Sequence, residues 1–154
     1  MRVSYHREPS LREDRADIHY REENEQIEIV RNFFSSLQSI TGKKNDEVCV
    51  LWPGSIYYLE VVDRKLFAYQ AAEVYQIDYS MKYFLDCFGA DGFVQISKNT
   101  VVNLYRVKRM QADMNMRLRL ILDNDEMLVL NRTYKKNFLD ALYRIQEVCH
   151  ENHS

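Results

Sequence analysis

The most informative parts of this sequence are Phe93-Val-Gln-Ile-Ser-Lys-Asn-Thr-Val-Val-Asn103 and Asn131-Arg-Thr-Tyr-Lys-Lys-Asn-Phe138. Each stretch places cationic and amide side chains at the point where an apolar strand ends. A side chain at the end of a strand is held firmly and projects from the body of the fold. Two such positions on one small β-rich domain predict a surface that binds a polyanion. The side chains concerned are Lys98 and Asn99 in the first stretch and Arg132, Lys135 and Lys136 in the second.

Short apolar runs separated by turn residues predict that most of the chain forms strands. Residues 116–123 alternate most clearly, with Met116 and three leucines facing one side and Arg117 and Arg119 facing the other. Turns are expected at Asp63-Arg-Lys65 and at residues 123–126. The expected strands are residues 48–52, 57–62, 66–71, 73–78, 93–96, 107–113, 116–123 and 127–130.

Three segments have helical periodicity. The first is residues 23–39, which we expect to end at Thr41-Gly42. The second is residues 80–88, where Ser80 can cap the helix, and the third begins at about Thr133. The fold class is therefore predicted to be mainly β (α+β), an elongated multi-stranded body with short flanking helices and an N-terminal helix. The apolar stripe of the last helix consists of Tyr134, Phe138, Leu142, Ile145 and Cys149.

We interpret residues 1–44 as an N-terminal extension that contains one amphipathic helix, with a possible short strand at 16–20. The helix has an apolar stripe that must be covered, either by the domain that follows or by a dimer or protein partner. Acidic residues crowd its first turns, which suits the positive end of the helix dipole and keeps the second alternative open. These acidic residues are Glu22, Glu23, Glu25 and Glu28.

Composition indicates one soluble globular domain with a small appendage, since 46% of the 154 residues are apolar and 29% are charged. No apolar run approaches the length of a membrane helix, and the N-terminus has no apolar core of a secretion signal, so we expect a cytoplasmic protein. The cysteines Cys49, Cys87 and Cys149 are far apart and odd in number. We interpret them as buried, reduced thiols.

The net charge of −2 argues mildly against a nucleic-acid partner. Its distribution weakens that objection, because residues 1–47 carry 8 basic and 10 acidic residues, whereas residues 48–154 carry 13 of each. The basic residues also occur in local groups. A neutral domain can therefore present a basic patch if its loops gather several groups on one face.

Enzyme chemistry has little support in the sequence. The serines have no Gly-x-Ser-x-Gly context, and no glycine-rich loop is present that could bind phosphate. The four histidines all lie in the N-terminal region or the tail. We interpret Glu60 and Asp63 as residues of a turn rather than a catalytic pair. We expect no catalytic residues, no metal, no cofactor and no small-molecule substrate.

Four blocks occur in a characteristic order: Ile56-Tyr-Tyr-Leu-Glu60, Asp63-Arg-Lys65, Phe93 to Asn103, and Arg132 to Phe138. Together they resemble the LytTR family of bacterial DNA-binding domains, over roughly residues 45–147. The resemblance implies that residues 45–154 form a LytTR-like domain whose loops enter successive major grooves. The positions that match its DNA contacts are Arg64, Lys65, Lys98, Asn99 and Arg132, and the adjacent Tyr134, Lys135 and Lys136 start a helix and suit phosphates.

The resemblance implies a transcription regulator that binds repeated sites on double-stranded DNA as a homodimer. Fewer than 50 residues precede the match, so we expect no internal receiver domain and no phosphorylation of one. The alternative is a protein-interaction module that is regulated by a membrane-bound inhibitor or another protein partner. The operator cannot be carried over, because family members often have His in the loops where this chain has Arg64-Lys65 and Ser97-Lys98.

Single residues keep a structural alternative at this point. Lys98 could be a solvated turn lysine, and Arg132 could form a structural ion pair. Tyr134 lies on the apolar stripe and could belong to the core. Asn103 is interpreted as a structural turn former rather than a reader of bases.

Overall fold

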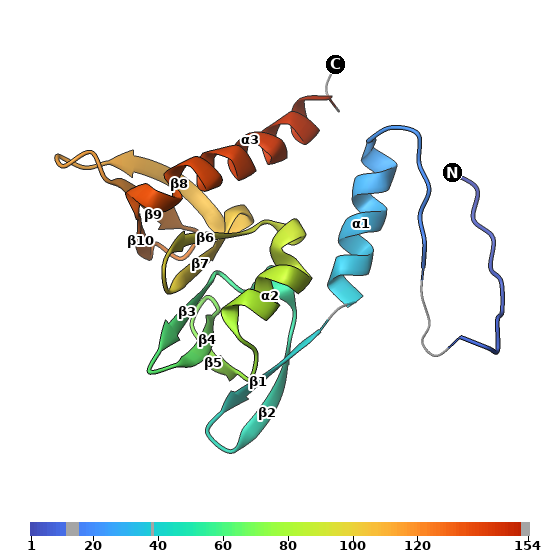
Figure 1. Cartoon of the computed structure of the whole chain (residues 1–154), viewed down its shortest axis with the longest axis horizontal. Coiled ribbons are helices and arrows are strands. Elements are labelled where there is room, and N and C mark those ends of the chain that lie inside the picture. The colour runs from blue at the N-terminus through green and yellow to red at the C-terminus, as the bar shows by residue number, and fades with distance from the viewer. Residues whose placement is uncertain (12–15, 38, 152–154) are drawn as a thin grey trace.

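The computed structural model describes residues 1–11, 16–37 and 39–151, with backbone alone from residue 147 onward and at 32 and 35–37. Three α-helices, ten strands and four short 3-10 turns are assigned within those residues (Figure 1). In chain order they are α1 (Glu25–Leu37), β1 (Ile40–Lys44), β2 (Glu47–Leu51), η1 (Pro53–Ser55), β3 (Tyr58–Val62), β4 (Lys65–Tyr69), β5 (Val74–Ile77), α2 (Met81–Phe88), η2 (Gly89–Asp91), β6 (Phe93–Ser97), β7 (Thr100–Asn103), η3 (Leu104–Arg106), β8 (Val107–Ala112), β9 (Leu118–Leu122), β10 (Met127–Leu130), η4 (Arg132–Tyr134) and α3 (Lys135–Glu151).

The strands form two antiparallel sheets, which confirms the prediction of a mainly β fold. Seven strands pair in the order β2-β1-β5-β4-β3-β7-β6, and three pair in the order β10-β9-β8. Short turns join β3 to β4, β6 to β7 and β9 to β10. Because neighbouring strands run in opposite directions, alternate turns gather at the same edge of each sheet.

Two apolar clusters hold these layers together. One lies under α2, where Phe84 and Phe88 pack with residues of β1, β3 and β4. The other lies under α3, where the fully buried Phe138 packs with Leu120 and Leu122 of β9 and Val102 of β7. Each of these helices therefore covers one part of the strand framework, and β7 contributes to both clusters.

A buried asparagine lies where the chain passes from the seven-stranded sheet to the three-stranded sheet. Asn103, 2% exposed, donates from Nδ2 to the carbonyl of Ile56 at 2.9 Å and accepts from the backbone N–H of Tyr105 at 3.1 Å. Its own backbone N–H donates to the carbonyl of Tyr57. The side chain thus fixes the bend from β7 through η3 into β8, and the interpretation of Asn103 as a structural turn former is confirmed.

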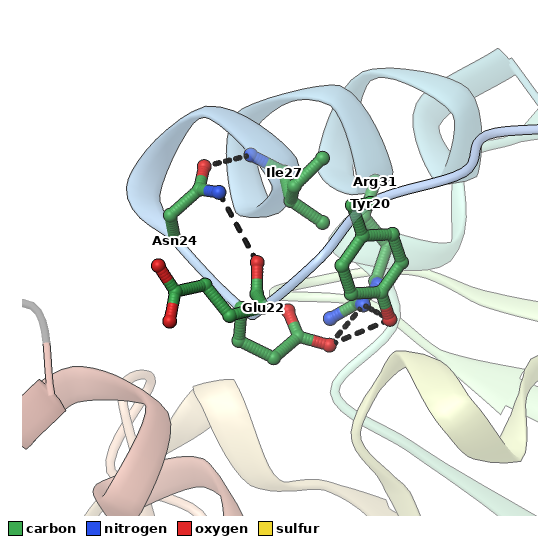
Figure 2. Close-up of polar contacts among 6 residues, drawn as sticks. Tyr20, Glu22, Asn24, Ile27 and Arg31 are labelled. Carbon is green, nitrogen blue, oxygen red and sulfur yellow. Dashed lines mark hydrogen bonds and ion pairs between the residues drawn. The ribbon is translucent and has the colours of Figure 1, made fainter.

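Helix α1 is joined to the segment before it by polar contacts (Figure 2). The Asn24 side chain accepts from the backbone N–H of Ile27 at 3.1 Å and so caps the helix. Arg31 donates to Glu23 at 2.8 Å and to the Tyr20 hydroxyl at 3.2 Å. Among the described residues, no helix is long and apolar enough to cross a membrane.

The apolar stripe of α1 is only partly covered. Ile27 is 6% exposed and α1 contacts η1, whereas Ile29 and Phe33 are about 60% exposed (60% and 58%). The helix therefore packs on the following domain and still presents apolar side chains to solvent. Both alternatives for its role have a structural basis.

Several local predictions were wrong. Residues 16–20 form no strand, and Thr41-Gly42 lies inside β1 rather than ending α1. A Cβ at Gly42 would lie 2.7 Å from Leu51 Cδ1, so glycine permits the close approach of β2 and β5. Strand β7 was not predicted, and Cys87 is exposed instead of buried. The predicted cap is confirmed, since Ser80 Oγ accepts from the backbone N–H of Tyr83 at 3.1 Å.

We predict that Asn103→Ala lowers the free energy of unfolding by about 1–3 kcal/mol, because it leaves the Ile56 carbonyl and the Tyr105 N–H without their buried partner. Urea unfolding followed by circular dichroism measures the change. Asn99→Ala, at an exposed turn, is the matched control and should stay within about 0.5 kcal/mol. An equal, small effect of both variants would contradict the role given to Asn103.

Candidate nucleic-acid interface

The strand register brings the predicted site residues to one edge of the molecule. The backbone N–H of Val61, near the end of β3, donates to the carbonyl of Asn99 in the β6–β7 turn at 2.8 Å. The backbone N–H of Asn131, after β10, donates to the carbonyl of Ile96 at 2.9 Å. The β3–β4 turn, the β6–β7 turn and the β10–α3 junction are thus joined side by side (Figure 1). We call them the edge turns.

The β3–β4 turn has two residues in left-handed conformation. Val62 pairs with Lys65, and between them Asp63 and Arg64 have φ values of 49° and 64°. Positive φ at both central residues is typical of a type I′ turn, in which glycine is favoured at the second position. Arg64 occupies that position at a conformational cost and is exposed.

The β6–β7 turn is shaped by its own side chains. The register shifts between Gln95 and Ser97, and Gln95 Nε2 donates to the carbonyl of Lys98 at 3.2 Å. The backbone N–H of Asn99 donates to Ser97 Oγ at 3.3 Å. These contacts fix the backbone of the turn and leave the side chains of Lys98 and Asn99 exposed.

At the β10–α3 junction, Asn131 Oδ1 accepts from the backbone N–H of Thr133 at 3.0 Å and caps η4. Arg132 is exposed beside this cap. Tyr134 is half-buried and packs against the cluster around Phe138, so the structure gives it a core contact. The predicted start of the last helix at about Thr133 agrees with η4 followed by α3.

Lysines begin α3 although the helix dipole disfavours them there. Lys135 and Lys136 are exposed in its first turn, which contains no acidic residue. In α1, by contrast, the first turn carries Glu25 and Glu28. A cation at a helix N-terminus costs about 0.3–1 kcal/mol. An anion bound from outside at this helix N-terminus would offset the free-energy cost of the two lysines.

Ion pairing separates the edge turns from the rest of the surface. In the part of the chain that the structure describes, no acidic side chain forms an ion pair with the basic residues of the edge turns. At the opposite edge, Arg106 pairs with Asp123 and Lys108 with Asp125. The structural ion pair considered for Arg132 is thus not found among these residues. The basic residues of the edge turns are Arg64, Lys65, Lys98, Arg132, Lys135 and Lys136.

Two residues of the β8–β9 turn join this edge, although we did not include them in the predicted site. Asn115 and Arg117 line a hollow of about 580 Å³ together with Ser97, Asn131 and Arg132. The sequence carried a usable signal, since Arg117 lies on the polar face of an alternating strand pattern and four residues after Asp113.

Comparison with known proteins identifies a family and a shared fold. Residues 46–143 match the sequence profile of the LytTr DNA-binding domain family. The chain is 29% identical over 108 residues to the sensory transduction protein LytR of Streptococcus agalactiae, across 70% of this chain and 44% of that protein. The chain thus spans less than half the length of that relative.

The fold is shared with a solved structure, the LytTr DNA-binding domain of a methyl-accepting/DNA response regulator from Bacillus cereus. The two structures have a TM-score of 0.63 and 23% sequence identity, over 68% of this chain and 95% of the other. At this identity the likeness shows the fold alone.

We predict that Arg64→Gly raises the free energy of unfolding by about 0.5–1 kcal/mol, because glycine adopts the left-handed conformation without strain. Urea unfolding measures the change, with Lys65→Gly in the adjacent strand as the control that should destabilise. Unchanged or reduced stability of Arg64→Gly would mean that Arg64 is not strained in this turn.

Proposed function

The chain belongs to the LytTr DNA-binding domain family, and we propose that it is a sequence-specific transcription regulator whose edge turns enter successive major grooves of DNA. The observation that carries this proposal is the row of exposed basic side chains at one edge without ion-pair partners among the described residues. A polyanion would supply those partners and release its counterions. The family is defined by DNA binding and not by an enzymatic activity.

The length of the row supports contact with more than one groove. Three strand spacings, about 14 Å, separate β4 from β6, and the β10–α3 junction lies beyond β6. A major groove is about 12 Å wide. A row that is longer than one groove is wide extends past that groove when it lies along the duplex, so its outer residues reach the neighbouring phosphates or the next groove.

Each residue type has a chemical role in this proposal. Arg64 and Arg132 suit bidentate contacts with the O6 and N7 atoms of guanine, and Asn99 suits adenine. Lys65 and Lys98 reach base edges or phosphates as point charges. Lys135 and Lys136, with the Tyr134 hydroxyl, suit phosphates at the start of α3, where free backbone N–H groups also attract anions.

The proposal includes two copies of the chain on repeated sites, acting in the cytoplasm. Before the matched segment the described residues include α1 and β1, and the proposal assigns no phosphoacceptor to them.

A second candidate function has one specific observation in its favour. Helix α1 keeps Ile29 and Phe33 largely exposed although Ile27 is buried. An apolar helix face of this kind suits a protein partner, including a membrane-bound inhibitor that keeps the protein from DNA. This role is compatible with DNA binding or could replace it.

A salt titration tests the proposal and separates the two candidates. The protein is first used to select duplexes from a random library, and binding of the selected duplex is measured by fluorescence anisotropy from about 50 to 200 mM salt. We expect affinity for the selected duplex to fall steeply with salt and to exceed that for a scrambled duplex. Selection that yields no preferred sequence, with no salt-dependent binding, would refute the proposal and favour the partner-binding role.

We predict that Arg132→Gln lowers affinity for the selected duplex by about 1–3 kcal/mol and relaxes the preference at one base pair, because it removes one bidentate contact. Arg144→Gln is the matched control. It also removes one positive charge, but from a position in α3 more than two turns beyond the edge, where Arg144 Nε donates to the carbonyl of Asp140 in the same helix. Equal effects of both variants would argue against a base contact by Arg132.

We predict a different signature for Lys135→Gln. Binding should weaken by a similar factor for all sequences, and the salt slope should fall by about 1, because a phosphate contact carries no sequence information. Repeating the selection and the titration with this variant measures both quantities. A selective loss at one base pair would assign Lys135 to a base instead of a phosphate.

A further inference from the structure

The β8–β9 turn protrudes beyond the rest of the molecule, at the left of Figure 1. Its residues 113–117 read Asp-Met-Asn-Met-Arg, and we call them the hairpin tip. Met114 is fully exposed and Met116 is 78% exposed. Single exposed apolar residues are common on protein surfaces, but two large ones at the most protruding turn are notable because a partner would meet them first.

The hairpin tip is held in shape by one carboxylate. The Asp113 side chain, 9% exposed, accepts through Oδ1 from the backbone N–H groups of Arg117 and Asn115, both at 2.9 Å. These two bonds hold the pKa of Asp113 below its usual range, and the bond from the Arg117 N–H has the larger effect. Asp113 Oδ2 lies 3.1 Å from Arg117 Nε, while the Arg117 side chain remains 50% exposed. The contact at Nε holds the guanidinium in place while half of the side chain stays exposed.

Strand register places the hairpin tip next to the edge turns. Ala112 pairs with Leu118, and Leu118 pairs with Leu130, the last residue of β10 before the junction. Measured along the strands, the hairpin tip therefore extends beyond the end of β10, where Arg132 follows. Asn115 and Arg117 line one side of the hollow whose other side includes Arg132.

We propose that the hairpin tip is an additional DNA contact, which enters the minor groove beside the major groove that faces Arg132. The inference rests on the proposed function. Asn115 and Arg117 would read the minor-groove edge of A·T pairs, while Met114 and Met116 pack against sugars and between base steps.

The minor groove is favoured over the major groove by the residue types at the tip. Proteins that bind the minor groove combine Arg or Asn with apolar wedges such as Met, which partly unstack a base step and bend the duplex. The floor of the major groove, in contrast, offers apolar contact only at thymine methyl groups. The two grooves also alternate along the duplex, so the groove after the one facing Arg132 is a minor groove.

The first test compares selections made with the wild-type protein and with Arg117→Gln. Arg109→Gln is the control, because it removes the same charge from the same hairpin at the end away from the tip. There Arg109 lies near Asp125, whose pKa is lowered mainly by Lys108 and to a lesser degree by Arg109. We expect the wild type and the control to select flanking positions that accept A·T and T·A alike and exclude G·C. Arg117→Gln should lose that preference and bind the wild-type duplex about tenfold more weakly.

A base substitution then identifies the groove. An inosine·cytosine pair presents the minor groove of an A·T pair and the major groove of a G·C pair. Replacing a flanking A·T pair of the selected duplex with it should leave affinity unchanged, whereas a G·C pair should weaken binding. Loss of affinity with inosine equal to the loss with guanine would place the contact in the major groove and overturn the proposal.

The methionine wedge is tested by the bend of the duplex, measured by energy transfer between dyes at its two ends. Met114→Ser combined with Met116→Ser should lower the bend, while Met127→Ser, at the opposite edge, should leave it unchanged. A bend that persists in the double variant would refute the wedge.

The selections also separate the two proposals. If the wild type selects duplexes but Arg117→Gln selects the same flanks, the tip proposal fails alone. If the wild type binds no DNA, the proposed function fails as well.

Discussion

The buried amide of Asn103 is the constraint on which the connection between the two sheets depends. It lies where β7 ends and the chain turns toward β8, and it makes hydrogen bonds to the segment before β3 and to the first turn of η3. A buried polar group must be satisfied, so the two segments can meet in few ways. The apolar clusters under α2 and α3 stabilise the layers, but apolar contacts alone tolerate sliding. The amide fixes the course of the chain where it leaves β7 for β8.

Much of the fold follows from local sequence patterns. Alternating residues in β9, the turn residues around Asp63 and the cap at Ser80 act within a few residues, and the elements they predict are present. Strand β1 was missed because its sequence, Ile-Thr-Gly-Lys-Lys, has little apolar character. It is a strand because it fits between β2 and β5, a tertiary effect that overrides propensity.

The edge turns could be listed from the sequence, but their arrangement could not. Lys98 and Arg132 are far apart in the chain, and the hydrogen bond from the Asn131 N–H to the Ile96 carbonyl brings their turns together. The bond from the Val61 N–H to the Asn99 carbonyl adds the β3–β4 turn. The hairpin tip shows the limit more clearly. Arg117 had a polar-face position in the sequence, yet its place beside Arg132 depends on the pairing of β8, β9 and β10. Strain at Arg64 likewise appears only in the backbone angles.

The uneven pairing of charges has a consequence for how the protein meets DNA. Basic residues without ion-pair partners among the described residues line one edge, while at the opposite edge Asp123 and Asp125 of the β9–β10 turn pair with Arg106 and Lys108. Because the net charge is −2, the acidic residues in excess lie elsewhere in the molecule, and the electric dipole moment would point toward the edge that we propose to bind DNA. In the field of a phosphate backbone such a dipole would experience a torque that turns the basic edge toward the duplex before contact. Orientation, rather than overall attraction, would set the fraction of encounters that succeed, and this fraction would fall as salt shortens the range of the field.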